Sequence, residues 1–303
     1  MRVSWTMAGF VAISLGAPCA PAPPQIAPSQ LVREVVYNEL QNHQSHGSWR
    51  YWIESSIQNE RHREEQVETA NGPVTRLVQS AGQPLTPAAE LQEQARLNNL
   101  MNSPRQQEAM RRKYADDEKQ IGRILAMLPE AFDFQYEGDA NGRYRLAFRP
   151  NPSYPASTIE QRIFHAMSGE LQIDARSKRL VLLNGHLDNN VDFGFGLLGR
   201  LNKGGWFRLE RTRVSATDWK TERIEVHMTG RALLFKSIAR ETSELRGGFV
   251  PVPPHLSFAQ GMTLLDQPFE EDAATTVRAI RPLILTAPGN DLSLTVLKQG
   301  SPH

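Results

Sequence analysis

Residues 131–149 read AFDFQYEGDANGRYRLAFR, and this stretch decides the fold class. An apolar or aromatic residue occupies every second position over 132–136 and again over 144–148, with polar or charged residues between them. The segment 138–142, GDANG, joins the two runs and has the composition of a tight turn. The pattern predicts a hairpin of two antiparallel strands with one buried face and one solvent-exposed face.

The same alternation continues on both sides of this hairpin. Further strands are expected to start near Gly169, Lys178, Gly205, Lys220 and Arg231. Upstream, three strands over 49–57, 60–69 and 74–79 form a predicted meander, with an Asn71-Gly72 turn before the third. The count is nine to eleven strands.

Helical patterns are fewer. Ser29 caps an expected helix that reaches Gln41, and Thr86-Pro87 and Ser103-Pro104 begin two more within a helical insert over 86–128. Two or three helices cannot cover both faces of a large sheet, so the sheet must curl around them. We therefore expect a mainly β member of the α+β class, a curved antiparallel half-barrel with the helices on its concave face.

The N-terminus has the features of an export signal. Arg2 precedes fifteen uncharged, mostly apolar residues, which suits a signal peptide over 1–20 and is too short for a membrane span. A Pro-rich linker over 21–30 follows. Cys19 lies where a lipoprotein would be acylated, although Pro18 departs from that pattern. The expected location is secreted, periplasmic or outer-membrane-associated, with no transmembrane span in the mature chain.

Composition excludes several functions. The 303 residues contain 34 Lys and Arg against 33 Asp and Glu, and a net charge of +1 gives no electrostatic footprint for nucleic acid. One cysteine excludes an intramolecular disulfide and a thiolate metal cluster. Domain boundaries are expected at 31–252 for the half-barrel and 253–303 for a loosely ordered C-terminal tail, with a short helix near 256–265.

Motifs for chemistry are weak. Residues 194–199 read GFGLLG, but Gly204-Gly205 leaves no room for the helix that a dinucleotide site needs. Phe195, Leu197 and Leu198 on this loop are instead expected to meet a membrane surface or a partner. His186, Asp188 and Asp192 form the best local cluster of metal-ligand types, but Asp188-Asn189-Asn190 has the composition of an ordinary turn. We expect no metal, no cofactor and no catalytic motif.

Residues 169–174 read GELQID, and a short turn leads to Arg179-Leu180-Val181. This pair of segments resembles the central hairpin of the LolA/LolB-like bacterial lipoprotein carriers and their RseB-type relatives. The runs GLLGRLNKGG at 196–205 and GRALLFK at 230–236 also resemble a family of secreted bacterial proteins without a known activity. The carrier resemblance implies an open half-barrel whose apolar hollow takes acyl chains. The helical insert and the C-terminal tail depart from the carriers.

The leading hypothesis is a non-catalytic envelope protein that binds a lipid, an acyl chain or a lipoprotein in the half-barrel. An envelope protein is a further possible partner. The alternatives are a secreted hydrolase whose catalytic site matches no recognisable sequence motif, and a scaffold module without a ligand. The expected apolar lining residues are Phe134, Tyr136, Leu146, Phe148, Leu171, Ile173, Phe207, Leu209, Val226 and Met228.

Overall fold

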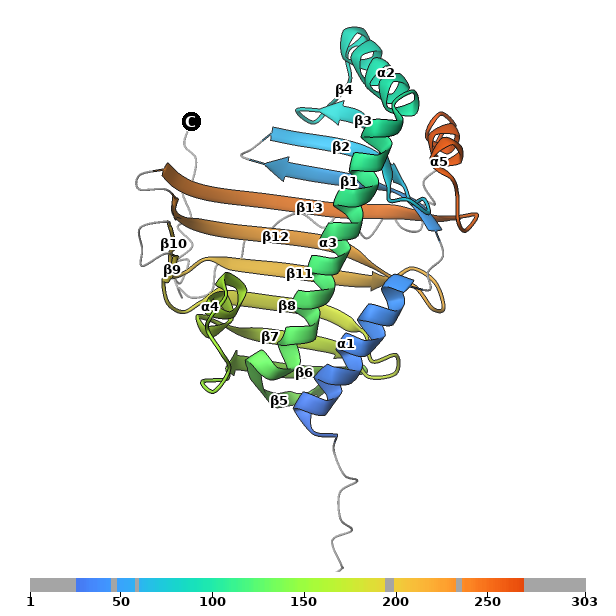
Figure 1. The fold of residues 1–303 in the computed structure, drawn as a ribbon. Helices are drawn as coiled ribbons and strands as arrows, with labels where there is room; N and C mark the ends of the chain where they lie inside the picture. Colours follow the sequence, from blue (N-terminus) through green and yellow to red (C-terminus); the bar gives the residue numbers. More distant parts are fainter. Residues whose placement is uncertain (1–25, 45–47, 58–59, 194–198, 233–235, 270–303) are drawn as a thin grey trace, which may run out of the picture.

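The fold is one antiparallel sheet that is not closed into a barrel, crossed by helices on one face (Figure 1). The computed structural model describes residues 26–44, 48–57, 60–193, 199–232 and 236–269. Within these ranges it contains thirteen strands and five helices, more than the nine to eleven strands and two or three helices expected. The mainly β α+β class is confirmed.

Eleven strands follow the order β4-β3-β2-β1-β13-β12-β11-β8-β7-β6-β5, and β9 and β10 form a small extension beside β12. The strands are β1 Ser48–Ile57, β2 Glu60–Val67, β3 Val74–Ser80, β4 Gln83–Pro84, β5 Phe132–Ala140, β6 Arg143–Pro150, β7 Met167–Asp174, β8 Leu180–Leu187, β9 Val191–Phe193, β10 Gly199–Leu201, β11 Trp206–Arg213, β12 Trp219–Ala232 and β13 Lys236–Val252.

The four N-terminal strands, β1 to β4, join the rest of the sheet through β1 and β13. Their antiparallel register runs from Ser48 opposite Val252 to Ile57 opposite Thr242. β13 continues in this ladder to Val252. This pairing places strands from the two ends of the described chain at the middle of one sheet.

The helices are α1 Pro28–Gln44, α2 Pro87–Met101, α3 Pro104–Ala131, α4 Ile159–His165 and α5 Phe258–Leu265. Two of the three predicted caps are confirmed: Thr86 accepts a hydrogen bond from the amide of Ala89, and Ser103 accepts one from the amide of Gln106, each at 3.3 Å. The cap predicted at Ser29 is wrong, because α1 already begins at Pro28. α1 and α3 lie across one face of the sheet, here called the helix face (Figure 1). α4 was not predicted.

The main core lies between α1 and strands β5 to β8. Leu31 and Val32 of α1 pack with Leu146 of β6 and Ile173 of β7, and none of these four exposes more than 2% of its surface. A second, smaller core lies on the opposite, outer face, where α5 covers β2 and β3. It contains Val67, Val74, Leu97, Leu256, Met262 and Leu265.

A buried ion cluster holds α1 on the sheet. The carboxylate of Glu39 accepts hydrogen bonds from the guanidinium of Arg179 at 3.1 and 3.2 Å and from the amide of Leu180 at 3.1 Å, and it also pairs with Arg211. Arg211 in turn donates to the carbonyl of Trp219 at 2.6 Å. Burial lowers the pKa of both arginines to about 10, so both remain charged at neutral pH.

Replacing Glu39 by Gln leaves two buried guanidinium groups without their counter-charge. We expect E39Q to lower the free energy of unfolding by about 3 kcal/mol, because removing one partner of a buried ion pair strands the other charge. Chemical denaturation measures this loss. The matched control is E34Q, on the exposed side of the same helix, with a change below about 0.5 kcal/mol. Equal effects of the two variants would contradict the structural role of the cluster.

Candidate functional site

The apolar layer of the helix face becomes less buried from β6 toward β12. Phe207 and Leu209 of β11 and Ile224, Val226 and Met228 of β12 are only half-buried, whereas the corresponding side chains of β6 and β7 are fully buried. These five residues share the helix face because side chains alternate along a strand and each pair of neighbours is in register. A partly uncovered apolar strip therefore crosses the middle of the sheet.

α3 carries a matching apolar stripe. At 100° per residue, positions 110, 114 and 121 fall within roughly 40° of one another on the helix. Met110, Tyr114 and Ile121 expose 36%, 42% and 43% of their surfaces, while Leu125 and Leu128 on the same side pack against the main core. The stripe is thus covered at the C-terminal end of α3 and partly uncovered from Met110 to Ile121.

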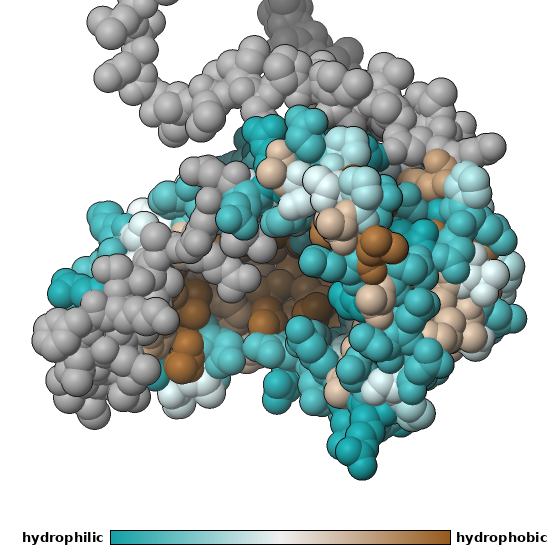
Figure 2. All heavy atoms as spheres, turned by 90° about the horizontal axis from the view of Figure 1, so that it is seen from above, coloured by the Kyte–Doolittle hydropathy of each residue, from teal (hydrophilic) through white to brown (hydrophobic). Residues whose placement is uncertain are grey.

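We call the space between the strip and the stripe the trough, and define it by Tyr114, Ile121, Phe207, Leu209, Ile224, Val226 and Met228. Seen from above, the molecule is hollowed, and hydrophobic side chains gather in the hollow while hydrophilic ones surround it (Figure 2). Gly185 makes room for the ring of Phe207, since a Cβ there would lie 2.3 Å from it. The floor of the trough is therefore set by a glycine–aromatic pair across β8 and β11.

Polar groups gather where the helix face reaches β1 and β2. Gln66 donates to the hydroxyl of Tyr51, and the carboxylate of Glu68 accepts from Lys220 at 2.7 and 2.8 Å. Burial, and then the charge of Glu68, raises the pKa of Tyr51. Burial, followed by Glu118 and Glu68, raises the pKa of Tyr114 to about 12. Both phenols therefore stay protonated and keep a hydrogen to donate.

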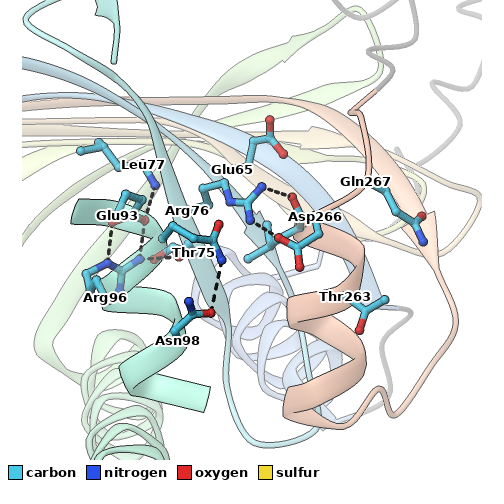
Figure 3. A network of polar contacts seen from close by, with 12 residues as sticks. Glu65, Thr75, Arg76, Leu77, Glu93, Arg96, Asn98, Thr263, Asp266 and Gln267 are labelled. Atoms are coloured by element: carbon cyan, nitrogen blue, oxygen red, sulfur yellow. Dashed lines mark hydrogen bonds and ion pairs between the residues drawn. The ribbon is translucent and has the colours of Figure 1, made fainter. Parts of the chain in front are cut away.

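A polar network fixes the sheet edge to which the N-terminal end of α3 is linked (Figure 3). Glu93 of α2 accepts from the amide of Leu77, and Arg96 donates to the carbonyl of Thr75 at 2.8 Å. On the other side of β3, Arg76 donates to the carbonyl of Leu265 at 2.7 Å and pairs with Asp266, next to α5. β3 is thereby clamped between α2 and α5.

All ten predicted lining residues lie on the helix face, in two groups. Leu146, Phe148, Leu171 and Ile173 are buried in the main core. Phe134, Tyr136, Phe207, Leu209, Val226 and Met228 are half-buried. The trough joins the last four of these with Tyr114, Ile121 and Ile224, which the predicted set lacked.

Other predictions fall outside the described residues: Cys19, the signal peptide over 1–20, residues 21–25 of the linker, the loop residues Phe195, Leu197 and Leu198, and the C-terminal tail beyond residue 269. The glycine-rich segment that contains this loop leads from β9 into β10, so a strand and not a helix follows it. This arrangement lacks the helix N-terminus on which a dinucleotide phosphate would lie.

Ser168, His186 and Asp188 meet on the outer face, in the combination that a hydrolase would use. Ser168 Oγ lies 3.1 Å from His186 Nε2, and Asp188 Oδ1 also lies 3.1 Å from the same Nε2. In a catalytic triad the acid holds one ring nitrogen so that the other can accept the serine proton. Here serine and acid share a single nitrogen, so the triad geometry is not formed.

Metal-ligand types do not gather in the part of the chain that the structure describes. No group of three or more His, Cys, Asp or Glu residues able to hold an ion occurs there. Asp192, expected to lie with His186 and Asp188, instead pairs with Arg200 of β10 at 2.5 and 3.1 Å. That ion pair, with its hydrogen bond, lowers the pKa of the Asp192 carboxyl.

Comparison with protein-family models, with curated proteins and with solved structures gives no match for this chain. Over the described ranges, none of the helices combines the length and the hydropathy needed to cross a bilayer.

Glu64 of β2 and Glu93 of α2 have pKa values that are shifted in opposite directions. Burial raises the pKa of Glu64, so its ionised form destabilises the fold as pH rises. For Glu93, burial raises the pKa, but hydrogen bonds from the side chain of Arg96 and the amide of Leu77 outweigh the effect of burial. The pKa of Glu93 is therefore lowered. We expect E64Q to raise the melting temperature at pH 7 and E93Q to lower it, and both differences to shrink as pH falls toward 4. Thermal unfolding across this pH range is the test; the same sign for both variants would contradict it.

Proposed function

We propose that the protein is a non-catalytic carrier of the bacterial cell envelope that binds a single-chain or double-chain acyl lipid, or the acyl part of a lipoprotein, in the trough. The observation that carries the proposal is a pair of apolar surfaces that stay partly uncovered, one on the side of α3 that packs on the sheet through Leu125 and Leu128, and one on β11 and β12. In a chain with two other well-packed cores, leaving such surfaces uncovered forgoes hydrophobic stabilisation.

The proposal includes a fold related to the LolA/LolB-like carriers, in which the sheet is a curved half-barrel with α1 and α3 on its concave face. The resemblance of residues 169–181 to the carrier hairpin and the export-type N-terminus support this reading. In such a fold an acyl chain lies between helix and sheet, and no bond in it is made or broken.

The polar end of the trough supports an amphipathic ligand rather than a pure hydrocarbon. Tyr114, 42% of whose surface is exposed, keeps its phenolic proton, and Glu68 with Lys220 provides a charge pair nearby. An acyl chain along the apolar strip would place its ester or headgroup at this end. The hydrolase alternative gains no support, because Ser168 and Asp188 compete for one nitrogen of His186.

A charge placed in the trough should prevent acyl binding without unfolding the protein. We expect I121K to weaken binding of palmitate and of a palmitoyl lysophospholipid at least about tenfold, because burying Ile121 against an acyl chain is worth roughly 1.5–3 kcal/mol and a lysine forfeits it. Ile121 is 43% exposed, so the variant folds. Fluorescent fatty-acid displacement and native mass spectrometry measure binding.

The matched control is L91K, which adds the same charge to an exposed leucine of α2, 73% of whose surface is accessible. L91K should bind both probes as the unaltered protein does. A well-folded protein that binds neither probe, or equal losses in I121K and L91K, would overturn the proposal and favour the scaffold alternative.

A further inference from the structure

The outer face carries a row of side chains that the trough does not use. Ser168, His186, Trp206 and His227 occupy neighbouring positions on β7, β8, β11 and β12, since Ser168 is opposite His186, His186 opposite Trp206 and Trp206 opposite His227. Their chain neighbours Met167, Leu187, Phe207 and Met228 belong to the helix face. The row therefore faces away from the trough.

Trp206 is the centre of the row. It exposes 41% of its surface, whereas Trp49, Trp52 and Trp219 expose 4%, 4% and 7%. The ring of His227 is nearly parallel to the indole, with 16° between the planes and 6.1 Å between centroids. Such a contact fixes the orientation of the indole and leaves part of an apolar plane open to solvent.

Hydrogen-bonding groups lie beside this plane. His186 exposes 56% of its side chain and Asp188 42%, and the two are within 3.1 Å of each other. The hydroxyl of Ser168 lies 3.1 Å from the same imidazole. A ligand that stacks on Trp206 would therefore find donors and acceptors at one edge of the ring.

Three arginines around the row are paired with carboxylates. Arg208 pairs with Glu210, Arg223 lies 3.4 Å from Glu225, and Arg145 lies 3.5 Å from Glu170. Asp188 beside His186 and Glu241 opposite His227 add exposed carboxylates to this surface. Carboxylates accept hydrogen bonds from hydroxyl groups and repel an anionic ligand. The surface suits a neutral ligand with many hydrogen-bonding groups.

We propose that this row is a binding platform for a neutral carbohydrate, with one pyranose ring stacked on Trp206 and its hydroxyls held by His186, Asp188 and Ser168. A pyranose combines the two required features, because its axial C–H groups form an apolar face and its hydroxyls project from the rim. The proposal is independent of the acyl-binding function, since platform and trough lie on opposite faces of the sheet.

The fluorescence of Trp206 can be used to detect a ligand that binds to the platform. In the variant W5F, which lacks the one tryptophan outside the described residues, the three other tryptophans are buried, so acrylamide should quench mainly the emission of Trp206. We expect maltotriose, cellotriose or chitotriose to protect this emission, with a dissociation constant on the order of 1 mM. Glycerol at the same hydroxyl concentration, which has no ring face, should give no protection.

Substitutions test how much each side chain of the platform contributes to sugar binding. By calorimetry or ligand-observed NMR, W206A should lose binding at least about tenfold, W206F should retain part of it, and H186A should weaken it severalfold. Y37A, which removes an exposed aromatic ring from α1, should bind as the unaltered protein does. Absence of protection by all three sugars, or sugar binding that survives W206A, would overturn the platform. Protection of Trp206 by a charged peptide or a detergent monomer but by no sugar would assign the row to another partner class.

Discussion

The pairing of β1 with β13 is the contact on which the rest of the architecture depends. It joins a four-stranded N-terminal meander, β1 to β4, to strands that lie some 190 residues later in the chain, from Ser48 opposite Val252 to Ile57 opposite Thr242. The segment between β4 and β5 must then travel from one edge of the sheet to the other. α2 and α3 make that connection, so the course of α3 across the helix face follows from the sheet order.

The dimensions explain why α3 is uncovered in its middle. Its 28 residues, at about 1.5 Å each, span about 42 Å, while ten strand spacings of about 4.8 Å separate β4 from β5. One end packs on α1, α4 and β5, and the other is held through α2 and the network around β3. Between these anchors Ile121 is 43% exposed, and Tyr114, whose side chain packs against Gly72 before β3, is 42% exposed. α3 is thus held at both of its ends, and the apolar side chains between these ends stay partly uncovered.

Local signals predicted local elements well. The caps at Thr86 and Ser103 and the alternation over 132–148 placed α2, α3, β5 and β6 correctly, because each depends on residues close in sequence. α4 was missed although Thr158 and Gln161 form a capping box, since its seven residues show no extended apolar period. The β1–β13 pairing was also missed. It is a choice among many strands with similar patterns, and no short motif specifies it.

The sequence allowed us to predict the face of the sheet on which the candidate site lies, but not which residues of that face stay uncovered. Alternation placed all ten predicted residues on the helix side, but Leu146 and Val226 carry the same pattern and differ in whether a helix covers them. Alternation also separates the two proposed surfaces within one dipeptide: Phe207 lies in the floor of the trough, and Trp206 lies on the outer face. Because β11 holds both side chains in a fixed register, a ligand on one face cannot contact the other. Any coupling between the two surfaces must therefore pass through the backbone of β11 and the strands paired with it.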